Sequence, residues 1–316
     1  KILITGGAGF IGSNLARKLL LAGNDVYIID NLSTGSFKNI EDLKTVKFSK
    51  IDIRDKMCIL TDAKFDEIYH LACPASPVQY QKSPVNTIDT CVMGSMVALE
   101  LARKQGAKIL LASTSEVYGD PIEHPQTEAY WGNVNPIGIR SCYDEGKRCA
   151  EALFFSYNLE YKVDIRIARI FNTYGPGMAI NDGRVISNFI CQVLQDKPIT
   201  IYGTGQQTRS FCYVSDTVKA LIELMRSDIQ MPVNIGNPNE KTMIEIAETV
   251  KTVSGKNNIM MLFEKLPQDD PCRRKPDISK AIKELNWEPE VTLMDGLFKT
   301  VEYFRNKLNI SGETNA

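Results

Sequence analysis

Histidine is almost absent from this chain: only His70 and His124 occur among its 316 residues. A zinc site and a nucleophile activated by histidine both depend on this residue type, so we expect neither, and no metal site. His70 follows a short apolar segment, residues 68–69. It is better explained as a hydrogen-bonded core residue than as a group that does chemistry.

Cysteine occurs eight times, but CxxC spacing and the regular pattern of a disulfide framework are both missing. Free cysteine behaves as a small apolar side chain and is common in proteins of reducing compartments. We therefore expect most of these residues to lie inside helices and strands as free thiols. They are Cys58, Cys73, Cys91, Cys142, Cys149, Cys191, Cys212 and Cys272.

An excess of either charge is also missing, because 37 Lys and Arg balance 38 Asp and Glu, for a net charge of −1. This balance gives no electrostatic reason to expect a nucleic acid or an anionic membrane as a partner. No apolar run approaches the roughly 18 residues of a membrane span, and no secretory pattern precedes Lys1. The first residues already form the first predicted strand, without a Met, so the sequence is compatible with a longer parent chain that carries an anchor.

What the chain does have is a glycine-rich turn between an apolar strand, residues 1–5, and leucines at helical spacing. Strand, turn and helix in this order are the context that a dinucleotide-binding fingerprint requires. Gly6 permits the tight turn, Gly9 lets the backbone approach a pyrophosphate, and Gly12 lets helix and strand pack closely. The N-terminus of the helix then faces the phosphates.

A second predicted strand, residues 26–29, ends at Asp30, eighteen residues after Gly12. A carboxylate at this position accepts a hydrogen bond from the ribose 2′-hydroxyl and repels a 2′-phosphate. The sequence therefore predicts NAD rather than NADP. The polar residues that follow, with Asn31, Thr34 and Gly35 among them, are expected to form a loop over the adenosine.

Tyr143 and Lys147 are four residues apart in a predicted helix, so both side chains stand on one face. A free phenol has a pKa of about 10 and is a poor base near neutral pH. An ammonium within about 4–6 Å favours the phenolate and lowers that pKa by roughly one to three units. Beside a dinucleotide, the pair predicts a base that takes a hydroxyl proton while hydride leaves the same carbon. Without the glycine-rich turn, the same pair would indicate only a surface helix.

The rest of the chain alternates predicted strands with helices, which is typical of an α/β fold with a doubly wound parallel sheet. Further strands are expected at residues 46–53, 66–71, 108–112, 164–169 and 199–203, and helices at 87–104, at 185–194 and from Ser215, as the N-cap, to Met225.

The strand at 108–112 delivers three hydroxyls, Ser113, Thr114 and Ser115, and the carboxylate of Glu116 to its carboxyl end. Ligands bind at this end of the strands in open α/β sheets. Hydroxyls and carboxylates are costly to bury without a purpose, which favours a functional site. The alternative is a turn that only forms hydrogen bonds at the end of the strand.

The GxxGxxG spacing of the glycines, together with the YxxxK pair, resembles the extended short-chain dehydrogenase/reductase superfamily, whose members act on nucleotide-sugars with tightly held NAD. The resemblance implies a Rossmann-type, doubly wound parallel sheet over residues 1–175, to which residues 208–230 return. It also implies a smaller C-terminal α/β lobe, residues 176–316, that binds the nucleotide-sugar.

Several less common stretches sharpen the match over nearly the whole chain. They are residues 71–77, 113–119, 133–138, 143–148 and 273–277. Together they resemble the UDP-glucuronic acid decarboxylases. By this resemblance Thr114, Tyr143 and Lys147 oxidise the sugar hydroxyl, and Ser115 and Glu116 form the pair that decarboxylases carry.

Arg274 matches the arginine that faces the sugar carboxylate in these enzymes. Without the match, the basic run at 273–275 would be expected on a solvated face. The departures from the family pattern are Cys73, where many relatives have Ser, and Asp89, where Lys is expected in the helix over the substrate.

The resemblance also implies a set of residues around each ligand. Around NAD, in addition to the glycines and the Tyr-Lys pair, these are Phe10, Ile11, Asp30, Asn31, Thr34, Gly35, Asp52, Ile53, Leu71, Cys73, Thr90 and Thr173. Around the UDP-sugar they are Tyr80, Glu116, Asn172, Arg184, Val185, Tyr202, Gln207, Arg209 and Arg274. Arg209 is the natural bidentate clamp for the diphosphate, and Asp52 has the alternative of a simple turn aspartate.

The function implied is decarboxylation of UDP-glucuronate to UDP-xylose and CO₂ through a 4-keto intermediate, with NAD recycled. The alternatives are a UDP-glucuronate 4-epimerase or another nucleotide-sugar epimerase, and a catalytically silent NAD-binding regulator. The resemblance suggests a homodimer through the helices at 87–104 and 143–158. We expect a soluble catalytic domain, cytoplasmic or, if the parent chain has an N-terminal anchor, in the Golgi lumen.

Overall fold

A seven-stranded parallel sheet is the centre of the computed structural model, which describes residues 1–55, 63–265 and 273–309. The strand order is β11-β6-β5-β4-β1-β2-β3, and every neighbouring pair is parallel. The strands are β1 (Ile2–Thr5), β2 (Val26–Ile29), β3 (Lys47–Ser49), β4 (Glu67–His70), β5 (Lys108–Thr114), β6 (Ile165–Ile170) and β11 (Val233–Ile235). Most residues of the inner strands are buried, because helices cover both faces of the sheet. This explains why the strands are short apolar segments.

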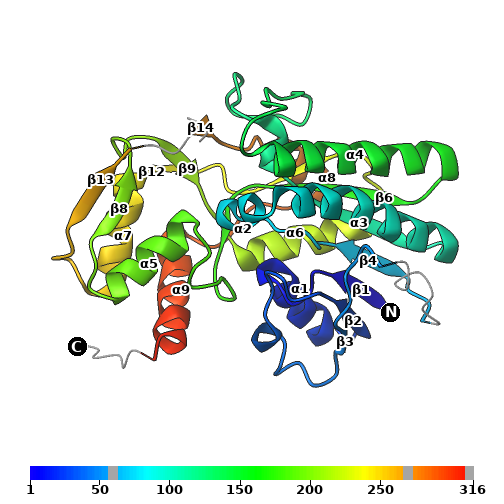
Figure 1. Cartoon of the computed structure of the whole chain (residues 1–316), viewed down its shortest axis with the longest axis horizontal. Helices are drawn as coiled ribbons and strands as arrows, with labels where there is room; N and C mark the ends of the chain where they lie inside the picture. Colours follow the sequence, from blue (N-terminus) through cyan, green and yellow to red (C-terminus); the bar gives the residue numbers. More distant parts are fainter. Residues whose placement is uncertain (56–62, 266–272, 310–316) are drawn as a thin grey trace.

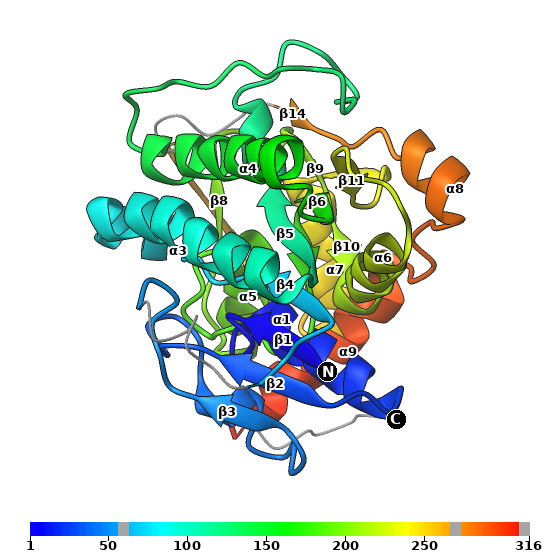
Figure 2. The ribbon, with the colours of Figure 1, turned by 90° about the vertical axis from the view of Figure 1, so that its right-hand side faces the viewer.

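Helices cover both faces of this sheet (Figure 2). On one face α3 (Pro84–Gln105) and α4 (Ser141–Tyr161) pack together, and Leu99 and Phe154 join Ile68 and Ile109 in one apolar cluster. On the other face α1 (Phe10–Leu21) packs against α6 (Val214–Arg226) in a second, larger cluster. The predicted fold class, a Rossmann-type doubly wound sheet, is confirmed.

A smaller α/β lobe lies beyond the carboxyl edge of the sheet (Figure 1). Its helices α5 (Val185–Leu194), α7 (Met243–Ser254) and α9 (Leu293–Lys307) pack around the parallel pair β8 (Ile199–Tyr202) and β13 (Met261–Glu264). The remaining elements are η1 (Phe37–Asn39), α2 (Pro77–Lys82), η3 (Ser115–Tyr118), β7 (Thr173–Tyr174), β9 (Thr208–Ser210), β10 (Cys212–Tyr213), β12 (Glu240–Thr242), β14 (Arg273–Arg274) and α8 (Ser279–Leu285). The division at residue 175 stays a prediction, and α6 and β11 both lie with the large sheet.

Several expected element ends are wrong, and two of them concern residues with an expected role. The strand expected at 46–53 is reduced to β3, so Asp52 lies in the turn after it, where it accepts hydrogen bonds from Arg54. The helix α6 begins at Val214 and not after a cap at Ser215, which is exposed in its first turn. The reason is that β10 runs directly into the helix, so the backbone at Tyr213 determines where it starts.

The expectation for His70 is confirmed. Its Nδ1 lies 2.8 Å from Thr5 Oγ1 and its Nε2 lies 3.3 Å from Ser95 Oγ, and the ring is fully buried. Burial, with a smaller contribution from the charge of Lys147, lowers the pKa of His70 to about 3. His70 is therefore a neutral core residue that ties β4 to β1 and α3.

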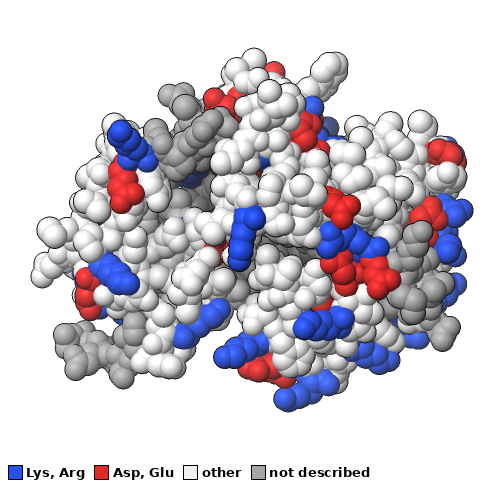
Figure 3. All heavy atoms as spheres, viewed as in Figure 1, with Lys and Arg blue, Asp and Glu red and all other residues white. Residues whose placement is uncertain are grey.

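The surface is mixed in charge. On the face shown in Figure 3, Lys and Arg lie among Asp and Glu rather than in one large patch. Across the described ranges of the chain, no helix combines the length and the apolar character needed to cross a membrane.

Candidate active site

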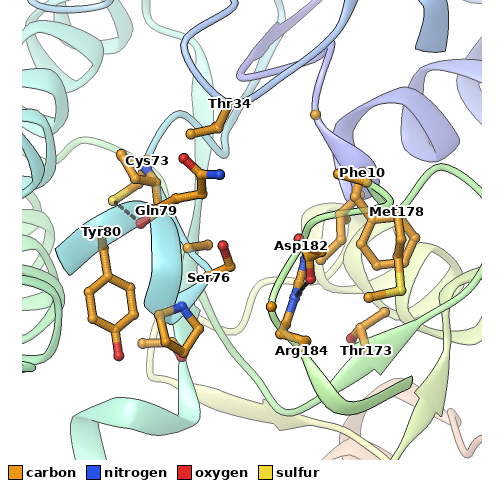
Figure 4. Close-up of a pocket in the computed structure, with 18 of the residues that line it drawn as sticks. Phe10, Thr34, Cys73, Ser76, Gln79, Tyr80, Thr173, Met178, Asp182 and Arg184 are labelled. Carbon is orange, nitrogen blue, oxygen red and sulfur yellow. Dashed lines mark hydrogen bonds and ion pairs between the residues drawn. The ribbon is translucent and has the colours of Figure 1, made fainter. Parts of the chain in front are cut away.

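A cavity of about 650 Å³ opens along the carboxyl edge of the sheet. One wall comes from the loop after β4 and from α2, with Cys73, Ser76 and Tyr80, and the other comes from α1 and the segment before α5, with Phe10 and Arg184 (Figure 4). This is the edge at which the glycine turn, η3 and the start of α4 all arrive, so residues predicted from distant parts of the sequence meet in one place.

The glycine end of the cavity is made from backbone. Gly6 has a φ of +73°, and its carbonyl accepts a hydrogen bond of 3.1 Å from the N–H of Gly9. A Cβ added to Gly12 would lie 2.4 Å from the Gly6 oxygen and 2.7 Å from the Gly7 Cα, so only hydrogen fits there. Gly6, Gly9 and Gly12 line the cavity at the start of α1. This cradle has the close backbone approach that a pyrophosphate needs.

Asp30 lies at the end of β2 and is 8% exposed. Its Oδ2 accepts a hydrogen bond of 3.0 Å from the N–H of Ala8, and its Oδ1 accepts one of 2.8 Å from the N–H of Leu32. Burial raises the pKa of Asp30, and the two backbone donors oppose that shift. The carboxylate borders the cavity where a ribose bound next to the glycines would lie.

Two residues predicted for this end do not line the cavity. Gly35 closes against Asp30, since a Cβ on it would lie 2.9 Å from Asp30 Oδ2. Asp52 is held by the side chains of Arg54 and Asn31, and Arg54 in turn reaches Asp89 at 2.8 Å. The departure at Asp89 is therefore part of an ion-pair chain outside the cavity lining.

The middle of the cavity holds Tyr143, Lys147 and Thr114. The Tyr143 ring stacks on Tyr80, with centroids 4.9 Å apart and planes at 2°, and Thr114 lies close enough to the phenol to favour its ionised form. Lys147 Nζ donates to the carbonyl of Ala112 at 2.9 Å and lies 6.0 Å from the centroid of the Tyr143 ring. The predicted helix therefore brings the pair to one face, as expected.

The sequence predicted a lowered pKa for Tyr143. This prediction is wrong, because the protein groups around the phenol raise its pKa instead. Burial raises the pKa of Tyr143 well above its ordinary value, Cys73 adds to that shift, and Thr114 only partly opposes it. The reason is that the phenol is 5% exposed, while the Lys147 ammonium is turned toward the Ala112 carbonyl.

At the sugar end, one carboxylate lies between two arginines. Both Arg274 Nη atoms donate to Glu116, with Nη2 3.0 Å from Oε2, and Arg140 Nη2 donates to the same Oε2 at 2.7 Å. Burial opposes ionisation of Glu116, but Arg274 and Arg140 outweigh it and lower its pKa to about 2. The default expectation of a solvated basic face at 273–275 is wrong for Arg274, which is 4% exposed and lines the cavity.

Two residues of this cluster were missed by the sequence reasoning. Arg140 lines the cavity three residues before Tyr143, and Asp144 is buried directly after it with Oδ1 unpaired. Burial, then the charge of Glu116, raises the pKa of Asp144 to about 7, although Arg140 opposes the shift. The available signal was helical spacing, because Arg140 and Asp144 are four apart at the start of α4.

The remaining predicted substrate residues also line the cavity. They are Asn172, Arg184, Val185, Tyr202, Gln207 and Arg209. Arg184 pairs with Asp182, with Nη2 2.9 Å from Oδ1, and Gln207 donates to the carbonyl of Tyr202 at 2.6 Å. The cavity is also lined by Phe10, Ile11, Asn31, Thr34, Ile53, Leu71, Cys73, Tyr80, Thr90, Ser115 and Thr173. Among the described residues, no cluster of three or more His, Cys, Asp or Glu side chains could hold a metal ion.

Comparison with known proteins agrees with this geometry. The family model described as GDP-mannose 4,6 dehydratase matches residues 3–300. UDP-glucuronic acid decarboxylase 6 of Arabidopsis thaliana is 54% identical over 312 residues, which cover 98% of this chain and 90% of the relative. UDP-glucuronic acid decarboxylase 1 of Xenopus tropicalis is 50% identical over 311 residues, which cover 98% of this chain and 73% of the relative.

Solved structures resemble the whole chain. UDP-glucose 4-epimerase from Thermotoga maritima superposes with a TM-score of 0.91 at 30% identity, covering 97% of this chain and 99% of that one. UDP-glucuronic acid 4-epimerase from Bacillus cereus, solved with UDP-glucuronic acid and NAD, gives a TM-score of 0.87 at 30% identity and the same coverage.

Fold, site and family match define the extended short-chain dehydrogenase/reductase class of nucleotide-sugar enzymes. Identity of 50–54% over 98% of the chain then narrows the class. Within it, the chain belongs to the family of UDP-glucuronic acid decarboxylases.

Proposed function

We propose that this chain decarboxylates UDP-glucuronate to UDP-xylose and CO₂ through a 4-keto intermediate. The observation that carries the proposal is the cluster of Glu116 with two arginines, Arg140 and Arg274, in the same cavity as Tyr143. Membership in the decarboxylase family supports the reaction. The Bacillus cereus relative solved with UDP-glucuronic acid and NAD supports the substrate and the cofactor.

NAD is the cofactor, and the residues at the glycine end fit it. Gly6, Gly9 and Gly12 leave the backbone open to a pyrophosphate, and Asp30 offers a carboxylate to the ribose 2′-hydroxyl. Bound NAD⁺ would supply the acceptor for a hydride from the sugar C4–H bond and, once reduced, the donor that returns it.

The chain's own residues move the proton and stabilise charge. Tyr143 Oη accepts the C4 hydroxyl proton as a phenolate, which the positive charges of Lys147 and of bound NAD⁺ would favour against the effect of burial. Thr114 also favours the ionised phenol. The C6 carboxylate is then β to a ketone, so loss of CO₂ leaves an enolate with charge on O4. Thr114 and the protonated Tyr143 can donate hydrogen bonds to that oxygen. The enolate then takes a proton at C5, from water or from an acid near Ser115 and Glu116, and the Tyr143 proton returns to O4 when hydride returns to C4.

The sugar end carries the charge that a carboxylated substrate needs. Two guanidinium groups, those of Arg140 and Arg274, lie against the Glu116 carboxylate at this end of the cavity. A guanidinium that lines the cavity can donate two hydrogen bonds to a substrate carboxylate, which favours a sugar acid over a neutral sugar. Arg274 is the residue we assign to the C6 carboxylate, and Arg140 holds Glu116 on its other side.

The direct test is to incubate the purified protein with UDP-glucuronate and to measure CO₂ and the nucleotide-sugar products. We expect stoichiometric CO₂ and UDP-xylose, with no net change in NAD. Formation of UDP-galacturonate without CO₂ would instead identify a 4-epimerase, the candidate that the Bacillus cereus structure favours. Absence of any product at full NAD occupancy would identify a silent NAD-binding protein, against which the presence of Thr114, Tyr143 and Lys147 argues.

We also propose a homodimer formed by α3 and α4 of two copies. Both helices expose large apolar side chains, among them Ile88 and Met93 on α3 and Phe155 and Leu159 on α4. Exposed apolar patches of this kind mark protein–protein contacts. Analytical ultracentrifugation should give a dimer for the unmutated protein and a monomer for the double variant Phe155→Glu, Leu159→Glu. The proposal would be contradicted if the unmutated protein sediments as a monomer at micromolar concentration.

For the compartment, we propose the cytoplasm or, for a parent chain with an N-terminal anchor, the Golgi lumen. The described cysteines Cys73, Cys91, Cys142, Cys149, Cys191 and Cys212 are free thiols, which suits a reducing compartment. Microscopy of the tagged full-length protein would decide between the two.

A further inference from the structure

The cavity wall contains a pair of thiols that the proposed reaction does not use. Cys73, in the loop after β4, and Cys91, on α3, have their Sγ atoms 3.0 Å apart. Cys73 is half-buried and lines the cavity next to Ser76 and Gln79 (Figure 4), whereas Cys91 is buried behind it. Both belong to a small cluster around the stacked Tyr80 and Tyr143 rings.

The two sulfurs have different environments. Cys73 Sγ lies 3.3 Å from the carbonyl of Pro74, to which it can donate while it accepts a hydrogen bond from Cys91. Burial disfavours a thiolate at Cys73, but the bond from Cys91 and then the charge of Lys147 outweigh it, so the pKa of Cys73 lies below its ordinary value. The hydrogen bond to Cys73, together with burial, raises the pKa of Cys91 well above its ordinary value.

This asymmetry is the arrangement of a reactive thiol beside a resolving thiol. A cavity-lining cysteine with thiolate character reacts with peroxides, and a neighbouring thiol then converts the product to a disulfide. We propose that Cys73 is a peroxide-modification site and that Cys91 resolves it to a Cys73–Cys91 disulfide.

The chemistry is balanced by one peroxide. The Cys73 thiolate attacks one peroxide oxygen, the O–O bond breaks, and hydroxide leaves as water after taking a proton, so Cys73 becomes a sulfenic acid. Cys91 then attacks the Cys73 sulfur, the S–O bond breaks, and a second water leaves with the Cys91 proton. Two thiols lose two electrons in total and one peroxide gains them. A dithiol reverses the change by exchange.

The disulfide would act on the catalytic helix. Cys91 packs against the backbone of Gly146, where an added Cβ would lie 3.0 Å from the Cys91 Cβ and 3.2 Å from its Sγ. Gly146 lies between Tyr143 and Lys147 on α4. A disulfide is about 2.05 Å long, so the sulfurs must approach by roughly 1 Å, which displaces the loop that carries Cys73 along the cavity wall. Oxidation should therefore reduce activity, and reduction should restore it.

The test uses the purified NAD-loaded protein with hydrogen peroxide, followed by thiol blocking and peptide mass spectrometry. We expect a linked peptide pair containing Cys73 and Cys91, and a loss of decarboxylase activity of about fivefold or more that dithiothreitol reverses. Only the activity readout rests on the proposed function. If the protein forms the link but makes no UDP-xylose from the start, the proposed function fails and the modification site stands.

Two variants separate the roles. Cys91→Ala should keep the untreated activity and form no link, and a sulfenic-acid reagent such as dimedone should label Cys73 in it. Cys149→Ala removes an exposed thiol on α4 and serves as the matched control, with unchanged sensitivity to peroxide. Peroxide-treated parent protein without the Cys73–Cys91 link would overturn the proposal, as would a link of Cys91 to Cys142 or oxidation confined to Cys149.

Discussion

The two ends of the cavity are built in different ways. The glycine end is made from the backbone of one continuous segment, with Asp30 as its buried carboxylate. The sugar end is made from charged side chains that meet from distant segments, since Glu116 and Arg274 are 158 residues apart. The glycine end thus depends on residues without a side chain. The sugar end depends on the pairing of the Glu116 carboxylate with arginine side chains. Substitutions should separate the two ends accordingly.

The largest effect should come from the proton acceptor. Tyr143→Phe keeps the buried ring and its stack on Tyr80 but removes the hydroxyl, so turnover should fall by about 10³-fold. NAD content of the purified protein should not change. Tyr157→Phe, on the same helix but bonded to Glu100, is the matched control and should keep its activity. Undiminished formation of UDP-xylose by Tyr143→Phe would remove Tyr143 from the mechanism.

Arg274→Ala should disable the sugar end and spare the glycine end. It removes one of the two cations on Glu116 and the assigned partner of the substrate carboxylate, so kcat/KM for UDP-glucuronate should fall by about 10²-fold. NAD binding, measured by calorimetry, should stay unchanged. Lys275→Ala, the neighbouring and more exposed cation, is the control. Equal losses of NAD binding and turnover would reduce Arg274 to a structural role.

Gly12→Ala should disable the glycine end, where NAD binds, and spare the sugar end. The added Cβ lies 2.4 Å from a backbone oxygen, and overpacking of this kind costs about 1–3 kcal/mol, so NAD affinity should fall about tenfold or more. Gly23→Ala is the control: its φ is +82° but nothing lies within 4 Å, so it should reduce stability and leave NAD affinity alone. A Gly12→Ala protein with normal NAD affinity would show that volume does not limit the glycine end.

The effect of Asp144→Asn should be visible in the pH dependence of stability. Because the pKa of Asp144 is raised to about 7 in the folded protein, the folded state binds a proton that the unfolded state has already lost. Asp144 therefore destabilises the fold progressively as pH rises from about 4, its unfolded pKa, to about 7, and by a constant amount above that. The variant should be more stable than the unmutated protein by about 4 kcal/mol at pH 8 and nearly equal to it at pH 4.

Urea unfolding of both proteins at several pH values measures this difference. A gap between the two curves that is the same at pH 4 and pH 8 would mean that Asp144 is not protonated in the folded protein near neutral pH.

The sequence predicts the glycine end of the cavity better than the sugar end. The glycines, Asp30 and the Tyr143–Lys147 pair were predicted because each signal is local: a turn, a strand end and one helical step. Arg140 and Asp144 were missed, and Arg274 would have been placed on the surface without the family resemblance, because their partners lie far away in the sequence. The direction of the Tyr143 pKa was also missed, since it depends on burial and on where the Lys147 ammonium points.

The amino-acid sequence by itself determined the alternation of strands and helices up to about residue 225, the dinucleotide turn and the residue types available for oxidation of a sugar. These follow from periodicity and from the conformations that glycine and short apolar segments adopt. Only the tertiary structure decided that Glu116 lies between two arginines, that Asp89 pairs outside the cavity and that two thiols share its wall. Charge pairing and burial depend on distances between atoms of remote segments, and those distances exist only in the folded chain.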